Sequence, residues 1–88
     1  MPEILRMFGM RFYFYSREHE PIHVHVKNAE GKAKFEITED AVILVYNRGL
    51  KNKDLRAAEM VLEENRELAI AKWKEYFGSS VEGGEDED

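Results

Sequence analysis

The chain has 88 residues, a formal net charge of −5, 43% hydrophobic and 11% aromatic residues, and no cysteine. This supplies enough apolar side chain for one small core, and the absence of cysteine excludes both a disulfide framework and a thiolate zinc site. Arg6 interrupts the apolar run at residues 1–8 and no long apolar stretch follows it, so we expect neither a signal peptide nor a membrane span and predict a soluble cytoplasmic protein.

The negative charge is concentrated at the C-terminus. Residues 79–88 read SSVEGGEDED and hold five acidic residues and no basic one, which leaves 13 acidic against 13 basic residues in the preceding 78. We therefore predict a single domain over residues 1–78 and a disordered acidic tail over residues 79–88. Such a tail is either a solvated end or a mimic of nucleic-acid charge.

The first half of the chain alternates apolar and polar residues as β-strands do. Strands are predicted over residues 4–8, 10–16, 22–27, 33–37 and 41–46, with turns at Phe8-Gly9, at residues 28–31 and at Glu39-Asp40. Residues 41–46 are almost all apolar, so we expect this strand to be central or covered on both faces. Five short strands in succession predict an antiparallel meander.

Helix-forming residues follow from about residue 52. Asn52 is the expected N-cap, and a single helix over residues 53–77 would be roughly 37 Å long at 1.5 Å per residue, longer than such a small sheet can cover. Because Asn65 falls on the apolar stripe, we favour two helices with a break near Glu64-Asn65, and a single bent helix is the alternative.

Each predicted helix has one apolar side. The first would bury Leu55, Ala58 and Leu62, and the second would end at Gly78. The residues of the second helix expected to point inward are Ala69, Trp73, Tyr76 and Phe77. We predict a small α+β domain, an antiparallel sheet of about five strands with a C-terminal two-helix unit packed on one face.

Strand alternation assigns side chains to the two faces of this sheet. The apolar set that the helices should cover is Phe12, Phe14, Val24, Val26, Phe35 and Ile37. The same parity places Arg11, Tyr13 and Tyr15 on the opposite face with His23 and His25, and Arg48 could reach its rim. A slip of one residue in register would exchange the two faces.

Residues 19–26, with the sequence HEPIHVHV, contain all three histidines. His23 and His25 project side by side from one strand, while His19 lies in the loop that precedes it. Histidine titrates near neutral pH and serves as a general acid or base and as a metal ligand. This cluster is the predicted site.

Three features together resemble a known family: the HEPIHVHV motif with the aromatic strand before it, the YNRG turn at residues 46–49, and the WKEYFG segment at residues 73–78. The chain resembles, over residues 1–78, the prokaryotic family known as domain of unknown function 4160. The resemblance implies a compact cytoplasmic protein encoded beside another small protein, an arrangement similar to toxin–antitoxin pairs. It assigns no catalytic residues, and the motif positions that it marks are His19, Pro21, His23, His25, Asn47, Arg48 and Gly49.

The first of three functional hypotheses is binding. A toxin–antitoxin-type or regulatory module would use this surface to contact nucleic acid, RNA above all, or a small protein partner, and a free strand edge could also pair with a second copy. The expected binding residues, besides the histidine pair, are His19, Tyr13, Tyr15, Arg11, Arg17 and Asn47. In this hypothesis His23 and His25 can instead be structural.

The second hypothesis is metal-independent, ribonuclease-like chemistry on a phosphate ester. His23 or His25 would be the base and Arg48, Arg11 or Arg17 would stabilise the developing charge.

The third hypothesis is a metal site. His23 and His25 would supply a His-x-His pair to a divalent transition metal such as zinc, with a third ligand from His19, Glu18, Glu20 or Glu36 and one open position. The main expectation is that no cofactor is needed.

Overall fold

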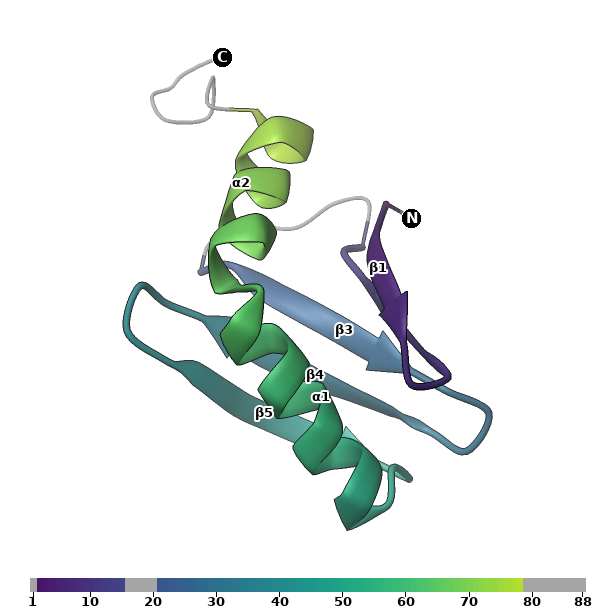
Figure 1. Cartoon of the computed structure of the whole chain (residues 1–88). Helices are drawn as coiled ribbons and strands as arrows, with labels where there is room; N and C mark the ends of the chain where they lie inside the picture. Colours follow the sequence, from purple (N-terminus) through teal and green to yellow (C-terminus); the bar gives the residue numbers. More distant parts are fainter. Residues whose placement is uncertain (1, 16–20, 79–88) are drawn as a thin grey trace.

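The computed structural model describes residues 2–15 and 21–78 (Figure 1). Its elements are β1 (Glu3–Met7), β2 (Met10–Tyr13), β3 (His23–Lys27), β4 (Lys32–Ile37), β5 (Val42–Arg48), α1 (Asn52–Glu64) and α2 (Arg66–Phe77). The strands form one antiparallel sheet in the order β1-β2-β3-β4-β5, so the predicted α+β meander with two C-terminal helices is confirmed. The acidic tail predicted at residues 79–88 lies outside the described residues. None of the helices in the described part has the length and apolar character needed to span a membrane.

Short turns set the register of the sheet. Phe8 and Gly9 both have positive φ, 56° and 75°, which is the backbone of a two-residue hairpin turn, and they bring Met7 opposite Met10. In the β3–β4 turn the Asn28 side-chain oxygen accepts hydrogen bonds from the backbone N–H groups of Glu30 and Gly31. Turns this tight leave little freedom to slip, so each strand presents a defined face.

The core lies between the sheet and α1, which crosses one face, while α2 continues past the end of the strands (Figure 1). All six apolar strand residues predicted to face the helices are buried, and the helices contribute to the same core: Ala58, Val61, Leu62, Ala69 and Trp73. The Phe14 ring packs edge-on against Trp73 at 5.3 Å and lies 5.8 Å from Phe77. These contacts hold α2 over the end of β2 and the start of β3.

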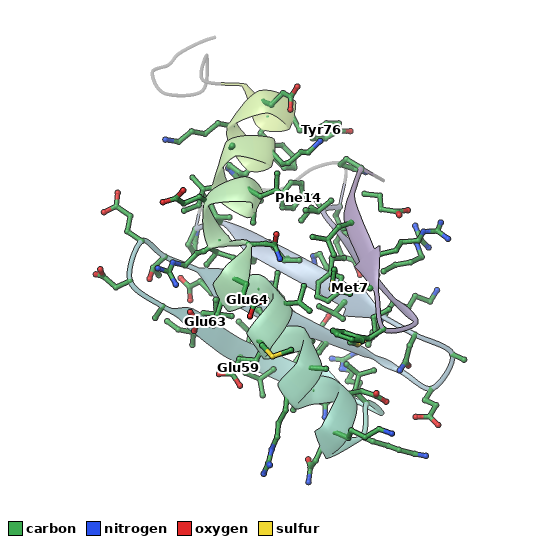
Figure 2. The ribbon with its side chains drawn as sticks, viewed as in Figure 1. Met7, Phe14, Glu59, Glu63, Glu64 and Tyr76 are labelled. Carbon is green, nitrogen blue, oxygen red and sulfur yellow. The ribbon has the colours of Figure 1, made fainter. Side chains whose placement is uncertain are left out.

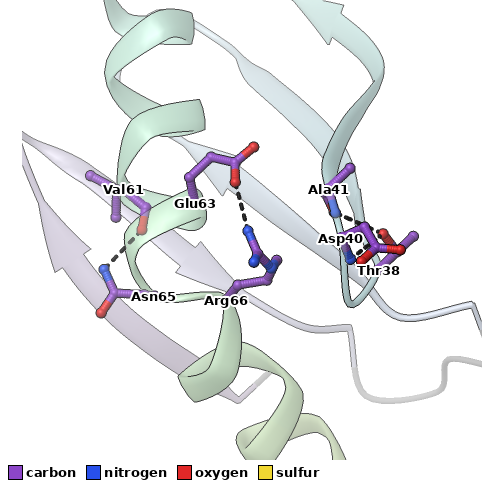
Figure 3. A network of polar contacts seen from close by, with 7 residues as sticks. All are labelled: Thr38, Asp40, Ala41, Val61, Glu63, Asn65 and Arg66. Carbon is purple, nitrogen blue, oxygen red and sulfur yellow. Dashed lines mark hydrogen bonds and ion pairs between the residues drawn. The ribbon is translucent and has the colours of Figure 1, made fainter.

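The predicted break between the helices is confirmed at Asn65. The Asn65 side chain donates a 2.8 Å hydrogen bond to the Val61 carbonyl, which also accepts the backbone N–H of Asn65 (Figure 3). Asn65 itself leaves helical geometry at φ −116° and ψ 26°, and Arg66 spans the break with a 2.7 Å contact to Glu63. The bend lets both helices follow the core where one straight helix would leave it.

The prediction that Asn52 is the N-cap of the first helix is wrong by one residue. Lys51 takes this position in an extended conformation, without a side-chain cap, and Asn52 is already helical. The physical reason is the preceding turn: Leu50 is buried, and its backbone N–H and carbonyl are both bonded by the Asn47 side chain. The chain is therefore directed back over the sheet before it reaches Asn52.

Two burial predictions are wrong. The last strand is an edge strand, with Ile43, Leu44 and Val45 exposed by 46%, 44% and 50%, whereas the sequence predicted a central or doubly covered strand. A meander places its final strand at the edge, and a narrow two-helix layer does not cover it. Tyr76 is also exposed, because Trp73 and Phe77 already fill the contact with Phe14 (Figure 2). Gly78 ends α2 with φ 84°, as predicted.

Candidate functional site

The face of the sheet opposite the helices, here called the outer face, carries a row of basic residues that crosses all five strands. Arg6 of β1 pairs with Arg11 of β2, and the pairing continues in order through Lys27, Lys32 and Arg48. Residues directly opposite each other in a sheet share a face, and neighbouring strands lie about 4.7–4.9 Å apart. These five residues are called the cationic row.

The acidic partner of the cationic row lies at its β1 end. Glu3 accepts from Arg6 at 2.6 Å and lies 3.6 Å from the Arg11 Nε atom, and the Arg6 guanidinium lowers the pKa of the Glu3 carboxyl. Within residues 2–15 and 21–78, no ion pair involves Lys27, Lys32 or Arg48. Like charges placed directly opposite each other destabilise a sheet. The strand pairing therefore places these like charges side by side, and their repulsion lowers the stability of the folded protein.

A pocket opens at the β1 end of the row. It has a volume of about 350 Å³ and is lined by three members of the row, Arg6, Arg11 and Lys27, with Gly9, Met10, Asn28 and Ala29. The Arg11 Nε atom is buried and has no hydrogen-bond partner among the described residues, and the Arg11 guanidinium lies 5.3 Å from the centre of the Tyr13 ring. The pocket thus combines three cations, two of which also face Glu3, and such a combination is suited to an anionic group.

A second row on the outer face, next to the cationic row, holds three aromatic side chains and one lysine. Tyr13 pairs with His25, His25 with Lys34, and Lys34 with Tyr46. The Tyr15 ring stacks on the His25 ring at 3.7 Å, and Tyr13 flanks it at 5.6 Å. Tyr13 and His25 are each only 3% exposed, and burial, with the neighbouring Tyr15, raises the pKa of Tyr13. His25 is thus enclosed by phenol rings and is not presented to solvent.

His23 lies at the junction between the outer face and α2. Its Nδ1 atom is 2.7 Å from the Pro21 carbonyl oxygen, which only accepts hydrogen bonds, so Nδ1 carries the proton and donates. The His23 ring is 5.7 Å from His25 and 5.7 Å from Trp73. The contact with Trp73 links the motif to the core, and the bond to Pro21 fixes the ring orientation.

Most of the sequence-predicted residues are brought together. Arg11, Tyr13, Tyr15, His23 and His25 share the outer face as the parity argument predicted, and Arg48 ends the cationic row, where its guanidinium lies 4.8 Å from the centre of the Tyr46 ring.

Other predicted residues are placed elsewhere. Asn47 pairs with the buried Ala33 on the helix side of the sheet, and both of its side-chain polar atoms bond Leu50. His19 and Arg17 lie outside the described residues. Among the residues that are described, no three histidine, aspartate or glutamate side chains are grouped to hold a metal ion, and the contribution of His19 stays a prediction.

Sequence reasoning missed the cationic row. Arg6, Lys27 and Lys32 each stand two residues or fewer from a turn, where charge is common in any protein. The two tight turns alone could have paired Arg6 with Arg11 and Lys27 with Lys32. Joining these pairs to each other and to Arg48 depends on how β2 pairs with β3 and on the register shift between Lys34 and Phe35, which no local pattern specifies.

A family model described as a domain of unknown function (DUF4160) matches residues 9–74 of this chain. No curated protein and no solved structure that was compared with it matches. The matched segment begins at the β1–β2 turn and includes the histidine motif, the cationic row from Arg11 onward and most of both helices.

Proposed function

This chain belongs to the family described as domain of unknown function 4160, and we propose that it is a small regulatory module, of the toxin–antitoxin type, that binds single-stranded RNA across the outer face of its sheet. The cationic row carries the proposal, with the partly exposed rings of Tyr46 and Tyr15 as the surface for the bases. The sugar–phosphate backbone of the RNA would lie along the cationic row, from Arg6 at one end to Arg48 at the other.

A polyanion removes the cost of the cationic row. Five basic side chains at successive strands repel one another, and a phosphate backbone lying across them replaces that repulsion by attraction and releases the counterions of the RNA. The pocket lined by Arg6, Arg11 and Lys27 is the place where one phosphate would bind. Such contacts supply affinity and make it depend strongly on salt.

Aromatic side chains on a sheet face favour single strands over duplexes. Single-stranded RNA is recognised largely by stacking of unpaired bases on tyrosine, histidine or arginine planes, whereas a duplex hides its bases. Tyr46 is partly exposed next to the cationic row, where the guanidinium of Arg48 lies near its ring, and Tyr15 is partly exposed on the far side of the Tyr13–His25 pair. These groups lie where bases would project from a backbone held by the row.

The burial of His25 favours binding over cleavage at that residue, because a general base must reach the ribose hydroxyl and His25 is only 3% exposed beneath Tyr15. The hydrogen bond from His23 Nδ1 to Pro21 fixes the tautomer whose Nε2 atom is the acceptor, so His23 is the residue that the cleavage test must examine. Ribonuclease-like chemistry and a His-x-His metal site are the alternatives, and the experiments below separate them from binding.

The test is a fluorescence anisotropy titration of a labelled single-stranded RNA over a series of salt concentrations. The wild type should bind. Lys27→Gln with Lys32→Gln should weaken binding and reduce the slope of log K against log salt by about 0.7 for each phosphate that the protein no longer neutralises. Lys53→Gln with Lys72→Gln removes the same charge from the helices and should change the slope much less. Equal effects of the two pairs, or no salt-dependent binding by the wild type, would contradict the proposal.

The same samples test the alternatives. RNA recovered intact after incubation supports binding, whereas specific cleavage that His23→Ala abolishes would support the ribonuclease-like alternative. A histidine NMR titration with zinc tests the metal alternative.

For the toxin–antitoxin role, induced expression should arrest a bacterial host, and the Lys27, Lys32 double variant should relieve the arrest.

A regulatory module of this type also needs a protein partner. Among residues 2–15 and 21–78, no strand pairs with the outer edge of β1 or of β5, so a partner strand can add there through backbone hydrogen bonds.

A further inference from the structure

The outer edge of β5 has little of the usual protection of an edge strand at residues 42–44. Residues 42–47 carry no charge, and Ile43, Leu44 and Val45 are all largely exposed, while Arg48, the charged residue of β5, and the register shift opposite Val45 both lie toward its C-terminal end. Proteins usually protect edge strands with charges or keep them very short, because an open, apolar edge pairs with other chains. The opposite edge follows that rule, since β1 has Glu3 and Arg6 within five residues.

The backbone groups that point away from β4 can be assigned. The Thr38 N–H donates to the Ala41 carbonyl at 2.9 Å, so Ala41 faces β4 (Figure 3 shows this turn). In an antiparallel ladder the direction alternates, so Ile43 also faces β4 while Val42 and Leu44 direct their N–H and carbonyl groups to the free side. The register shift between Lys34 and Phe35 falls opposite Val45. The regular part of the free edge is therefore the stretch centred on Ile43.

We propose that β5 pairs antiparallel with β5 of a second copy of this chain, with the two-fold axis at Ile43. Val42 then lies opposite the partner's Leu44 and Leu44 opposite the partner's Val42, which forms about four backbone hydrogen bonds between the copies. The two Ile43 side chains meet across the axis on the outer face. The pairing joins the two sheets into one, and it does not depend on RNA binding.

Self-complementarity favours a second copy as the occupant of this edge. An isologous contact requires one patch to match itself. Residues 42–47 carry no charge, so pairing them with the same residues of a second copy brings no like charges together. An antiparallel arrangement also brings the acidic Glu39-Asp40 turn of each copy beside the Arg48 end of the other. Glu59 and Glu63 lie on the β5 side of α1 (Figure 2), and the pairing of Glu63 with Arg66 reduces the repulsion between the two α1 helices.

Sedimentation equilibrium over a range of protein concentrations is the first test, in the absence of RNA. The wild type should have twice the mass of one chain, and Leu44→Lys should shift it to the mass of one chain by placing a charge in the interface. Met7→Lys is the matched control, because Met7 is 43% exposed on the β1 edge and Leu44 is 44% exposed on the β5 edge. Circular dichroism melting curves of both variants should match that of the wild type, which checks that each variant is folded.

Several outcomes would overturn the pairing. These are a wild type that is monomeric at every concentration, a dimer that Met7→Lys disrupts as much as Leu44→Lys does, and a dimer that forms only when single-stranded RNA is added. The last of these separates the failure of this inference from the failure of the RNA-binding proposal.

Disulfide trapping tests the register and avoids the risk of misfolding. The chain has no cysteine, so Ile43→Cys introduces a single thiol. The Cα atoms of a pair without mutual hydrogen bonds lie about 4.5 Å apart, within the range of about 4.4–6.8 Å that a disulfide spans. Mild oxidation should convert Ile43→Cys to a covalent dimer and leave Met7→Cys as single chains. A wild-type dimer whose Ile43→Cys variant fails to crosslink would overturn this register.

Discussion

At the scale of single residues, His25 is buried although neither α1 nor α2 covers its face of the sheet. Tyr15 stacks on its ring, Tyr13 flanks it, and His23 meets it edge-on. Aromatic contacts of this kind contribute roughly 0.5–1.5 kcal/mol each beyond the area that they bury. His25 therefore acts as the centre of a small aromatic cluster that shapes the outer face, while the partly exposed side chains around it are those that a ligand can reach.

Replacing His25 should cost stability. His25→Ala removes the ring beneath Tyr15 and leaves a cavity, so we expect the free energy of unfolding to fall by about 2 kcal/mol or more in urea denaturation. Lys34→Ala, at the residue paired with His25, is the control and should change it by less than about 0.5 kcal/mol. If His25→Ala unfolds at the same urea concentration as the wild type, the cluster is not structural.

At the scale of elements, the turn between β3 and β4 contacts the turn that follows β5. Gly31 of the first turn lies against Arg48 and Gly49 of the second. A Cβ atom at Gly31 would overlap the Arg48 carbonyl and lie 2.7 Å from the Gly49 Cα atom, and Gly49 itself has φ 99°. Together with the Asn47 bonds to Leu50, this contact explains the structural part of the YNRG turn: it directs the chain from the sheet into α1 and positions Arg48 at the end of the cationic row.

Gly31→Ala should strongly destabilise the protein, because backbone atoms rather than a flexible side chain occupy the space that the methyl group needs. We expect a loss above about 2 kcal/mol and weaker RNA binding through displacement of Arg48. Gly9→Ala is the control. Its φ of 75° costs roughly 1–2 kcal/mol, but nothing lies within 4 Å of the added carbon, and it leaves Arg48 in place. Equal RNA affinity for the Gly31 variant and the wild type would show that Arg48 is not held by this contact.

At the scale of the whole molecule, charge is segregated rather than simply negative. The cationic row occupies one face, while the five acidic residues of the sequence 79–88 account for the entire net charge of −5. Net charge therefore does not argue against a polyanionic ligand. A protein's summed field affects how fast and how tightly such a ligand associates, and salt screens that effect.

Deletion of residues 79–88 should strengthen RNA binding without changing the melting temperature. Removing five negative charges reduces the long-range repulsion of RNA, and the gain in affinity should shrink as salt is raised. Replacing the five acidic residues by their amides in the full-length chain controls for length and should have the same effect. An unchanged affinity at low salt would show that the tail does not influence the outer face.

Much of the fold follows from local patterns. Alternation in residues such as Phe12, Val24 and Phe35 determines which side chains face the helices, and Asn65 on an apolar stripe marks the break between α1 and α2, because both signals depend only on neighbours along the chain. The exposure of Ile43, Leu44 and Val45 was not predictable in this way. An apolar run indicates burial in general, but only the position of β5 at the end of the meander decides what covers it.

For the candidate site, the alternation of side-chain direction along each strand was enough to place His23, His25, Tyr13 and Tyr15 on one face. Three other features come from the pairing of distant strands: the enclosure of His25, the open edge of β5 among the described strands, and the single row formed by Arg6, Arg11, Lys27, Lys32 and Arg48. Enclosure, cross-strand neighbours and free edges depend on how residues far apart in the chain are brought together, and no local pattern specifies that.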